Sequence, residues 1–192
     1  MFKSNFIRCA MTMLIAFSIC AAAVAQNKTQ SAGNQSNVRG AVQSFFSLLK
    51  SQKYSELYDF LPSQLQSQTS REQLTASLTR LGAYLTVERL EVGRIQQKGD
   101  FAVVDTTIYG NLKRTMNMNG EEVKEGRVTV QQYLLKENGR WKITTADNRT
   151  RDFFLKRNPE FKKQFQLSQP QFAFKQKGRW TPLGQPPNVP RQ

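Results

Sequence analysis

Apolar residues between positions 38 and 82 recur every three or four positions, which is the spacing of one buried helix face. The first run consists of Val38, Ala41, Val42, Phe45, Leu48 and Leu49. A second, short run covers 54–61, and a third begins at Ser70, where Gln73 completes a capping-box pattern. The pattern therefore predicts three helices, with Gly82 as the left-handed residue that ends the third.

After Gly82 the apolar period changes to two, which is typical of strands with one buried face. In the first predicted strand, 85–92, the alternation changes phase in the middle, which indicates a β-bulge. Further strands are predicted at 101–109, 128–135 and 141–145, with a polar connection at 117–126 and a tight Asn138-Gly139 turn. Three helices followed by about four mostly antiparallel strands predict an α+β fold with the helices packed on a curved sheet.

Residues 151–192 differ from the rest of the chain, because they hold six of the seven prolines. The Asn-Pro-Glu sequence at 158–160 predicts a capped helix that carries Phe161 and Phe165, and a second hairpin is expected at 172–181. We expect the two phenylalanines to pack on the domain, because large exposed apolar patches are uncommon in monomers. The alternative is an aromatic and basic surface that contacts an acidic partner.

The first 25 residues have the order of a secretory signal peptide, with Lys3 and Arg8 before an apolar run and small residues before Gln26. We expect cleavage near Ala25-Gln26 and a secreted or periplasmic product with no transmembrane anchor. Both cysteines of the chain lie in this signal, so the mature protein would form no disulfide.

The expected organisation has four parts. These are a signal peptide at 1–25, a flexible polar linker at 26–37, a folded domain at 38–150 and a basic, aromatic extension at 151–192.

The chain is strongly basic, with 28 Lys and Arg against 14 Asp and Glu and a net charge of +14. An exported basic protein meets anionic wall polymers and lipid head groups, so we expect an anionic envelope polymer rather than nucleic acid as the partner. The alternative is a cationic, solvated exterior without a specific partner. The candidate anion-binding residues of the extension are Lys162, Lys163, Lys175, Lys177 and Arg179.

Four segments carry a resemblance to a known superfamily. They are Phe45-Phe46-x-x-Leu49, Tyr54-x-x-Leu57-Tyr58, Ser70-Arg71-Glu72-Gln73-Leu74 and the run 133–143. In this order, residues 38–147 resemble the nuclear transport factor two-like superfamily, also called SnoaL-like or cystatin-like α+β cones, and specifically an exported bacterial member. The resemblance implies a curved sheet closed by helices into a cone that often holds a pocket, and a homodimer formed through the sheet. It says little about activity, because one fold hosts many functions.

The residue types restrict the chemistry. The chain has no histidine, and the mature chain would have no cysteine, which excludes Ser-His-Asp triads, thiol catalysis and the usual zinc sites. We therefore expect no metal and no cofactor. Cofactor-free isomerases and cyclases of the superfamily imply a weak catalytic candidate, Asp105 with Tyr109 or Tyr133. The preferred interpretation is that Asp105 lies on the polar face of the sheet and pairs with an arginine.

Six aromatic residues are candidates for lining a small apolar ligand in the cone, namely Tyr54, Tyr58, Tyr84, Tyr109, Tyr133 and Trp141. The preferred interpretation is that they belong to the core. We expect an exported, non-enzymatic binding or accessory module of the cell envelope. The alternatives are a cofactor-free isomerase-like or cyclase-like enzyme, and a structural or assembly partner in the envelope.

The signal peptide leads to a testable prediction. Expression in a host with a secretory pathway should release a product whose intact mass begins at Gln26. A product that keeps Met1 and stays with the membrane would contradict the prediction.

Overall fold

The computed structural model describes residues 37–118, 120–144 and 147–183. These residues form an antiparallel sheet with helices, an α+β arrangement as expected. The predicted signal peptide, nearly all of the predicted linker and the last nine residues lie outside the described residues. No helix within the described ranges is long and apolar enough to cross a membrane.

The helical part runs from residue 38 to residue 82. It consists of α2 (Val38–Lys50), α3 (Tyr54–Leu57), a 3₁₀ turn η1 (Tyr58–Phe60), α4 (Ser63–Gln66) and α5 (Arg71–Gly82). The Ser70 hydroxyl accepts from the backbone N–H of Gln73, and the Gln73 side chain accepts in return, which confirms the capping box. The short α4 was not predicted, because four residues carry no periodic signal.

Gly82 does not have the role that was predicted for it. It belongs to α5 and is not among the residues with a left-handed backbone. A Cβ atom at this position would overlap the hydroxyl of Tyr54. Glycine therefore allows α5 to approach α3 closely.

The sheet contains six strands in the described residues rather than about four. They are β1 (Leu85–Lys98), β2 (Phe101–Met118), β3 (Glu121–Glu137), β4 (Arg140–Ile143), β5 (Gln171–Gln176) and β6 (Arg179–Pro182). The order is β1-β2-β3-β5-β6, and β4 also pairs with β3. The predicted C-terminal hairpin supplies the additional strands, since β5 pairs with β3 at 126–129 and β4 pairs with β3 at 134–137.

The strand boundaries also differ from the prediction, since β1 continues to Lys98 beyond the expected 85–92 and the next two strands extend into the expected polar connection. The expected polar connection at 117–126 is largely strand, because β2 continues to Met118 and β3 begins at Glu121. These residues lack an apolar alternation, but pairing of β2 with β3 satisfies their backbone groups. The predicted bulge in β1 is confirmed by a register shift between Val87 and Arg89.

Both predicted tight turns have the same backbone. Asn138 and Gly139 have φ of 49° and 75°, and Lys177 and Gly178 have φ of 46° and 74°. Two successive residues with positive φ match the right-handed twist of the flanking strands in a two-residue hairpin.

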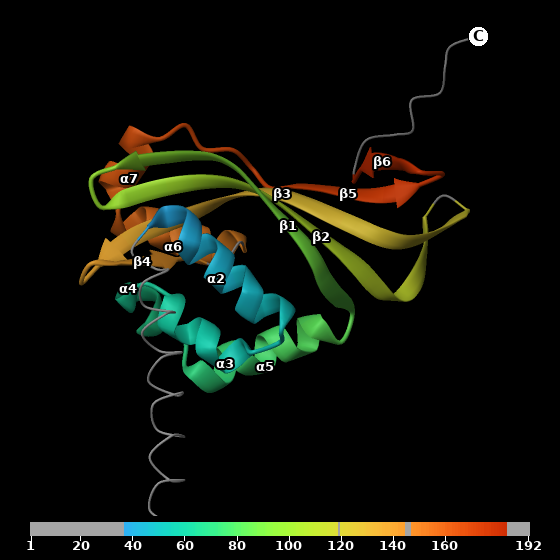
Figure 1. Ribbon diagram of the computed structural model, residues 1–192, viewed down its shortest axis with the longest axis horizontal. Coiled ribbons are helices and arrows are strands. Elements are labelled where there is room, and N and C mark those ends of the chain that lie inside the picture. The colour runs from blue at the N-terminus through green and yellow to red at the C-terminus, as the bar shows by residue number, and fades with distance from the viewer. Residues whose placement is uncertain (1–36, 119, 145–146, 184–192) are drawn as a thin grey trace, which may run out of the picture.

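The two faces of the sheet are covered differently (Figure 1). The inner face, which includes Ala102, Val104 and Leu134, packs in one core with α2, α3 and α5. The outer face carries the alternate residues, including Val103 and Tyr133. Figure 1 shows the hairpin β5–β6 at the opposite end of the sheet from α7.

The helices α6 (Asn148–Arg157) and α7 (Pro159–Gln164) cover one end of the outer face. Phe154, Phe161 and Phe165 are buried there against Val103 and Tyr133, so the expected packing of the extension on the domain is confirmed. The sequence suggested that the side chain of Asn158 caps α7, but Asn158 makes no such hydrogen bond. Its amide instead donates to the carbonyl of Phe154 at 2.9 Å and closes the end of α6.

This packing predicts a large effect of Phe161→Ala. The Phe161 ring is fully buried, and its centroid lies 5.0 Å from that of Tyr133 and 4.9 Å from that of Phe165. The substitution should lower the free energy of unfolding by about 3–5 kcal/mol, measured by urea denaturation. Phe172→Ala is the control, because that ring is 52% exposed, and its cost should stay below about 1 kcal/mol. Equal losses in the two variants would contradict the packing.

Candidate functional site

The space between the helices and the sheet is filled by side chains. Phe45, Phe46, Phe60 and Trp141 are all buried there, and Trp141 is 1% exposed. Two surface depressions, of about 880 and about 360 Å³, both open on the outer face. The inner face is therefore a core, and the outer face carries the recessed surface.

The six aromatic candidates do not come together. Tyr54 and Trp141 pack in the inner core, whereas Tyr133 is buried on the outer face among the phenylalanines. Tyr84 is 65% exposed, and Tyr109 lies on the outer face beside the larger depression. Tyr133 and Trp141 are thus core residues, as the preferred interpretation had it. The six candidates form no shared pocket in the described residues.

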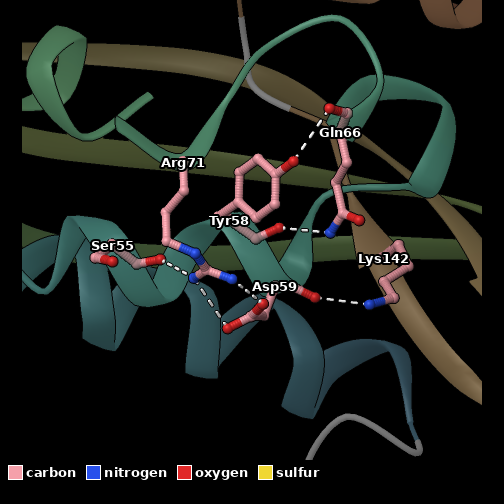
Figure 2. A network of polar contacts seen from close by, with 6 residues as sticks. All are labelled: Ser55, Tyr58, Asp59, Gln66, Arg71 and Lys142. Atoms are coloured by element: carbon pink, nitrogen blue, oxygen red, sulfur yellow. Dashed lines mark hydrogen bonds and ion pairs between the residues drawn. The ribbon is translucent and has the colours of Figure 1, made fainter. Parts of the chain in front are cut away.

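Tyr58 belongs to a polar network that joins the helices to the sheet (Figure 2). The Arg71 guanidinium lies 4.7 Å from the Tyr58 ring centroid and contacts both carboxylate oxygens of Asp59, at 2.6 and 3.2 Å. The hydrogen bond that Arg71 donates to Asp59 is the main cause that raises the pKa of Arg71.

The same network extends to α4 and β4. The Tyr58 hydroxyl donates to the carbonyl of Gln66 at 3.1 Å, and Lys142 Nζ donates to the carbonyl of Asp59 at 2.6 Å. All of these contacts connect elements of the fold, so the role of Tyr58 is structural.

Asp105 pairs with an arginine, which is the interpretation preferred from the sequence. Its Oδ2 lies 3.4 Å from Arg94 Nε, and its Oδ1 accepts from Gln131 at 3.1 Å. The tyrosines considered with it have other partners. Tyr109 donates to Glu91 at 2.9 Å, and the Tyr133 hydroxyl accepts from Arg151.

The five basic candidates of the extension do not form one surface. Lys162 and Lys163 are on α7, and the other three are on the hairpin at the opposite end of the sheet (Figure 1). Three of the five have carboxylate partners, at 2.6–2.9 Å, in the pairs Lys163–Glu160, Lys175–Glu125 and Lys177–Glu121. Their charges are therefore partly neutralised.

A row of stacked cations and rings crosses the outer face at the hairpin end. Arg89 Cζ lies 3.8 Å from the Tyr109 ring centroid, Tyr109 meets Trp180 edge to face at 5.7 Å, and Arg127 Cζ lies 4.8 Å from the Trp180 centroid. These residues come from β1, β2, β6 and β3. We call this row the cation–aromatic ladder.

The larger depression lies beside this ladder, and we call it the basic groove. Its charged lining consists of Arg89, Lys113, Lys124 and Lys175, with Glu88 and Glu125 as the only carboxylates of the described lining. Tyr109 and Trp180 form part of its wall. The groove therefore combines an excess of positive charge with rigid aromatic side chains.

Sequence reasoning had selected Tyr109 and Lys175, but not the other members of the groove and the ladder. The residues missed are Arg89, Lys113, Lys124, Arg127 and Trp180. The sequence predicted the hairpin at 172–181 that carries Trp180. It did not indicate which strand the hairpin joins.

Glu91 holds one end of the ladder. It accepts hydrogen bonds from the Tyr109 hydroxyl and from Arg89, and these two bonds, in that order, lower the pKa of the Glu91 carboxyl. The bond to Glu91 correspondingly raises the pKa of Arg89. No group of three or more His, Cys, Asp or Glu suited to a metal ion occurs in the described ranges.

The fold defines an α+β protein of the nuclear transport factor two-like class. Residues 37–146 match the family model described as an NTF2-like N-terminal transpeptidase domain, and the chain belongs to this family. The resemblance to the superfamily is thereby confirmed, whereas membership of an exported bacterial group stays a prediction. Helices α6 and α7 and the hairpin β5–β6 follow the matched residues.

No curated protein matches the chain. Among solved structures, the chain is similar to a SEC-C motif containing protein from Rhodopseudomonas palustris, with 13% identity and a TM-score of 0.41. That match covers 59% of this chain and 79% of the other.

The lowered pKa of Glu91 predicts a pH dependence of the ladder. The ordinary pKa of a glutamate carboxyl is 4.5, and that of Glu91 is lower in the folded state. Such a carboxyl stabilises the fold fully at pH values above 4.5, and this contribution is lost as the pH falls through the folded-state pKa. The indole N–H signal of Trp180, followed by NMR, should therefore shift below pH 4.5 while that of buried Trp141 stays constant. Glu91→Gln should abolish the shift, and an unchanged titration in that variant would refute the assignment.

Proposed function

We propose that this chain is an exported, non-catalytic binding module of the cell envelope and that its basic groove binds an anionic polymer. The groove itself carries the proposal, because four cationic side chains line an open depression of about 880 Å³ against two carboxylates. The net charge of +14, of which only Lys3 and Arg8 belong to the predicted signal peptide, attracts polyanions to the surface in general, and the groove provides a defined place for them.

The surroundings of the groove support binding by a prepared surface. The ladder fixes Arg89 against Tyr109 and Trp180 against Arg127, so these side chains lose little conformational freedom when a ligand arrives. An open groove, rather than a closed cavity, suits a chain-like ligand that extends beyond the site.

A binding role is better supported than catalysis or storage of an apolar ligand. Asp105 is held by Arg94, and both tyrosines proposed beside it are engaged elsewhere. The interior of the cone is occupied by the residues of the inner core. The family description, an N-terminal domain of transpeptidases, agrees with an accessory role. The order of the first 25 residues supports export.

The proposal predicts that Lys113, which has no ion-pair partner in the described ranges, and Lys124, whose pair with Glu122 is long at 3.7 Å, matter more for binding than equal charge elsewhere. The double variant Lys113→Gln/Lys124→Gln should weaken binding of linear polyphosphate at least about tenfold, because each lost charged hydrogen bond is worth roughly 1.5 kcal/mol. Titration calorimetry at low salt is the measurement. Binding should also weaken steeply with added salt, since screening acts over about 8 Å at physiological ionic strength.

The double variant Lys162→Gln/Lys163→Gln is the matched control. It removes the same charge from α7, at the other end of the sheet (Figure 1). Binding in this variant should stay within about threefold of the parent, as expected for distant charges in salt. Equal weakening by both pairs would mean that binding follows net charge alone, and would refute the groove.

A further inference from the structure

Lys175, a cation of the basic groove, already has an internal partner inside the groove. Lys175 Nζ lies 2.9 and 3.0 Å from the two carboxylate oxygens of Glu125, and both residues line the groove. Their side chains are 38% and 46% exposed, so the pair stands at the surface rather than in the core. Glu125 therefore occupies the position that an oxyanion of a ligand would take.

Arg89 is held by Glu91, and the remaining cations are less engaged. Lys113 has no ion-pair partner among the described residues, and Lys124 pairs with Glu122 only at 3.7 Å, with both side chains 71% exposed. Arg127, stacked on Trp180 beside the groove, forms no close ion pair in the described ranges, although its charge helps to lower the pKa of Glu91. The groove thus contains free positive charge on Lys113 and Lys124 next to two neutralised cations, Lys175 and Arg89, whose partner is Glu91.

We propose that the basic groove binds the phosphate groups of a linear polymer, and that Glu125 is an internal competitor which a phosphate displaces from Lys175. This inference rests on the proposed function of the groove and specifies its ligand. No covalent step is involved, because one ion pair is exchanged for another.

The geometry favours phosphate over carboxylate. A ligand carboxylate would offer Lys175 the same two contacts that Glu125 supplies, without the advantage of belonging to the same chain. A tetrahedral phosphate directs its oxygens to different sides, so that one group can contact lysines from different strands. Lys113, Lys124 and Lys175 come from β2, β3 and β5 and line one groove.

The site also depends on the C-terminal hairpin. Lys175 and Trp180 lie on β5 and β6, beyond residues 37–146 that match the family. The ladder holds this hairpin over β2 and β3 through Tyr109 and Arg127. The competing pair Lys175–Glu125 thus joins the hairpin to the matched domain. One of its two residues lies outside the part of the chain that matches the family.

The test is Glu125→Gln, with Glu121→Gln as the matched control. Both variants raise the net charge by one and both release a lysine of the hairpin, since Glu121 pairs with Lys177 at 2.6 Å. Glu121 does not line the groove. Affinity for linear polyphosphate should rise about tenfold in Glu125→Gln and less than threefold in Glu121→Gln. The affinity of Lys175→Gln for polyphosphate should be lower than that of the parent. In the double variant Lys175→Gln/Glu125→Gln, the glutamate substitution should give no tenfold gain, because the lysine that it would release is absent.

Polygalacturonate, a carboxylate polymer, separates this inference from the proposed function. The parent protein should bind polyphosphate at least about tenfold more tightly than polygalacturonate of equal charge density. If the parent binds neither polymer, the proposed function fails. If it binds both equally, or if the two glutamate variants behave alike, the proposed function stands and this inference is wrong. Stronger binding to phosphatidylglycerol vesicles than to polyphosphate would also overturn it, in favour of a lipid surface.

Discussion

The structure depends on the long antiparallel pairing of β2 with β3. Its register is continuous from Phe101 opposite Leu135 to Asn111 opposite Glu125. Because side chains alternate along a strand, this register assigns every residue of the two strands to the inner or the outer face, and a slip by one residue would exchange them. The inner residues complete the core with the N-terminal helices. The outer residues divide between a packed end and a polar end.

The packed end of the outer face is stabilised by aromatic rings and one buried arginine. Arg151 is 5% exposed, lies over the ring of Tyr133, and donates to the Tyr133 hydroxyl and to the carbonyl of Ser168. Both contacts are made by Nη2, while Nε and Nη1 of Arg151 are buried without a hydrogen-bond partner among the described residues. Nη2 thus links α6 to the sheet, although the buried guanidinium is only partly satisfied. This end is therefore suited to stability and not to exchange with ligands.

The polar end is stabilised without a dry core. Arginines lie against Tyr109 and Trp180, and carboxylates such as Glu91 and Glu125 satisfy part of the positive charge. Exposed ion pairs contribute little to stability individually, but they can be exchanged for a ligand at low cost. The same sheet thus presents a rigid, water-accessible basic surface on the scaffold that the packed end supports.

The sequence by itself determined the local features of this protein: the capping box at Ser70, the tight turn at Asn138-Gly139, and the helix-then-strand order that identifies the superfamily. Each depends on neighbouring residues, whose preferences act within a few positions. Only the tertiary structure decided that the C-terminal hairpin joins β3, and that Trp180 therefore meets Tyr109 and Arg127. Pairing between distant strands depends on packing across the whole sheet, and no local pattern encodes it.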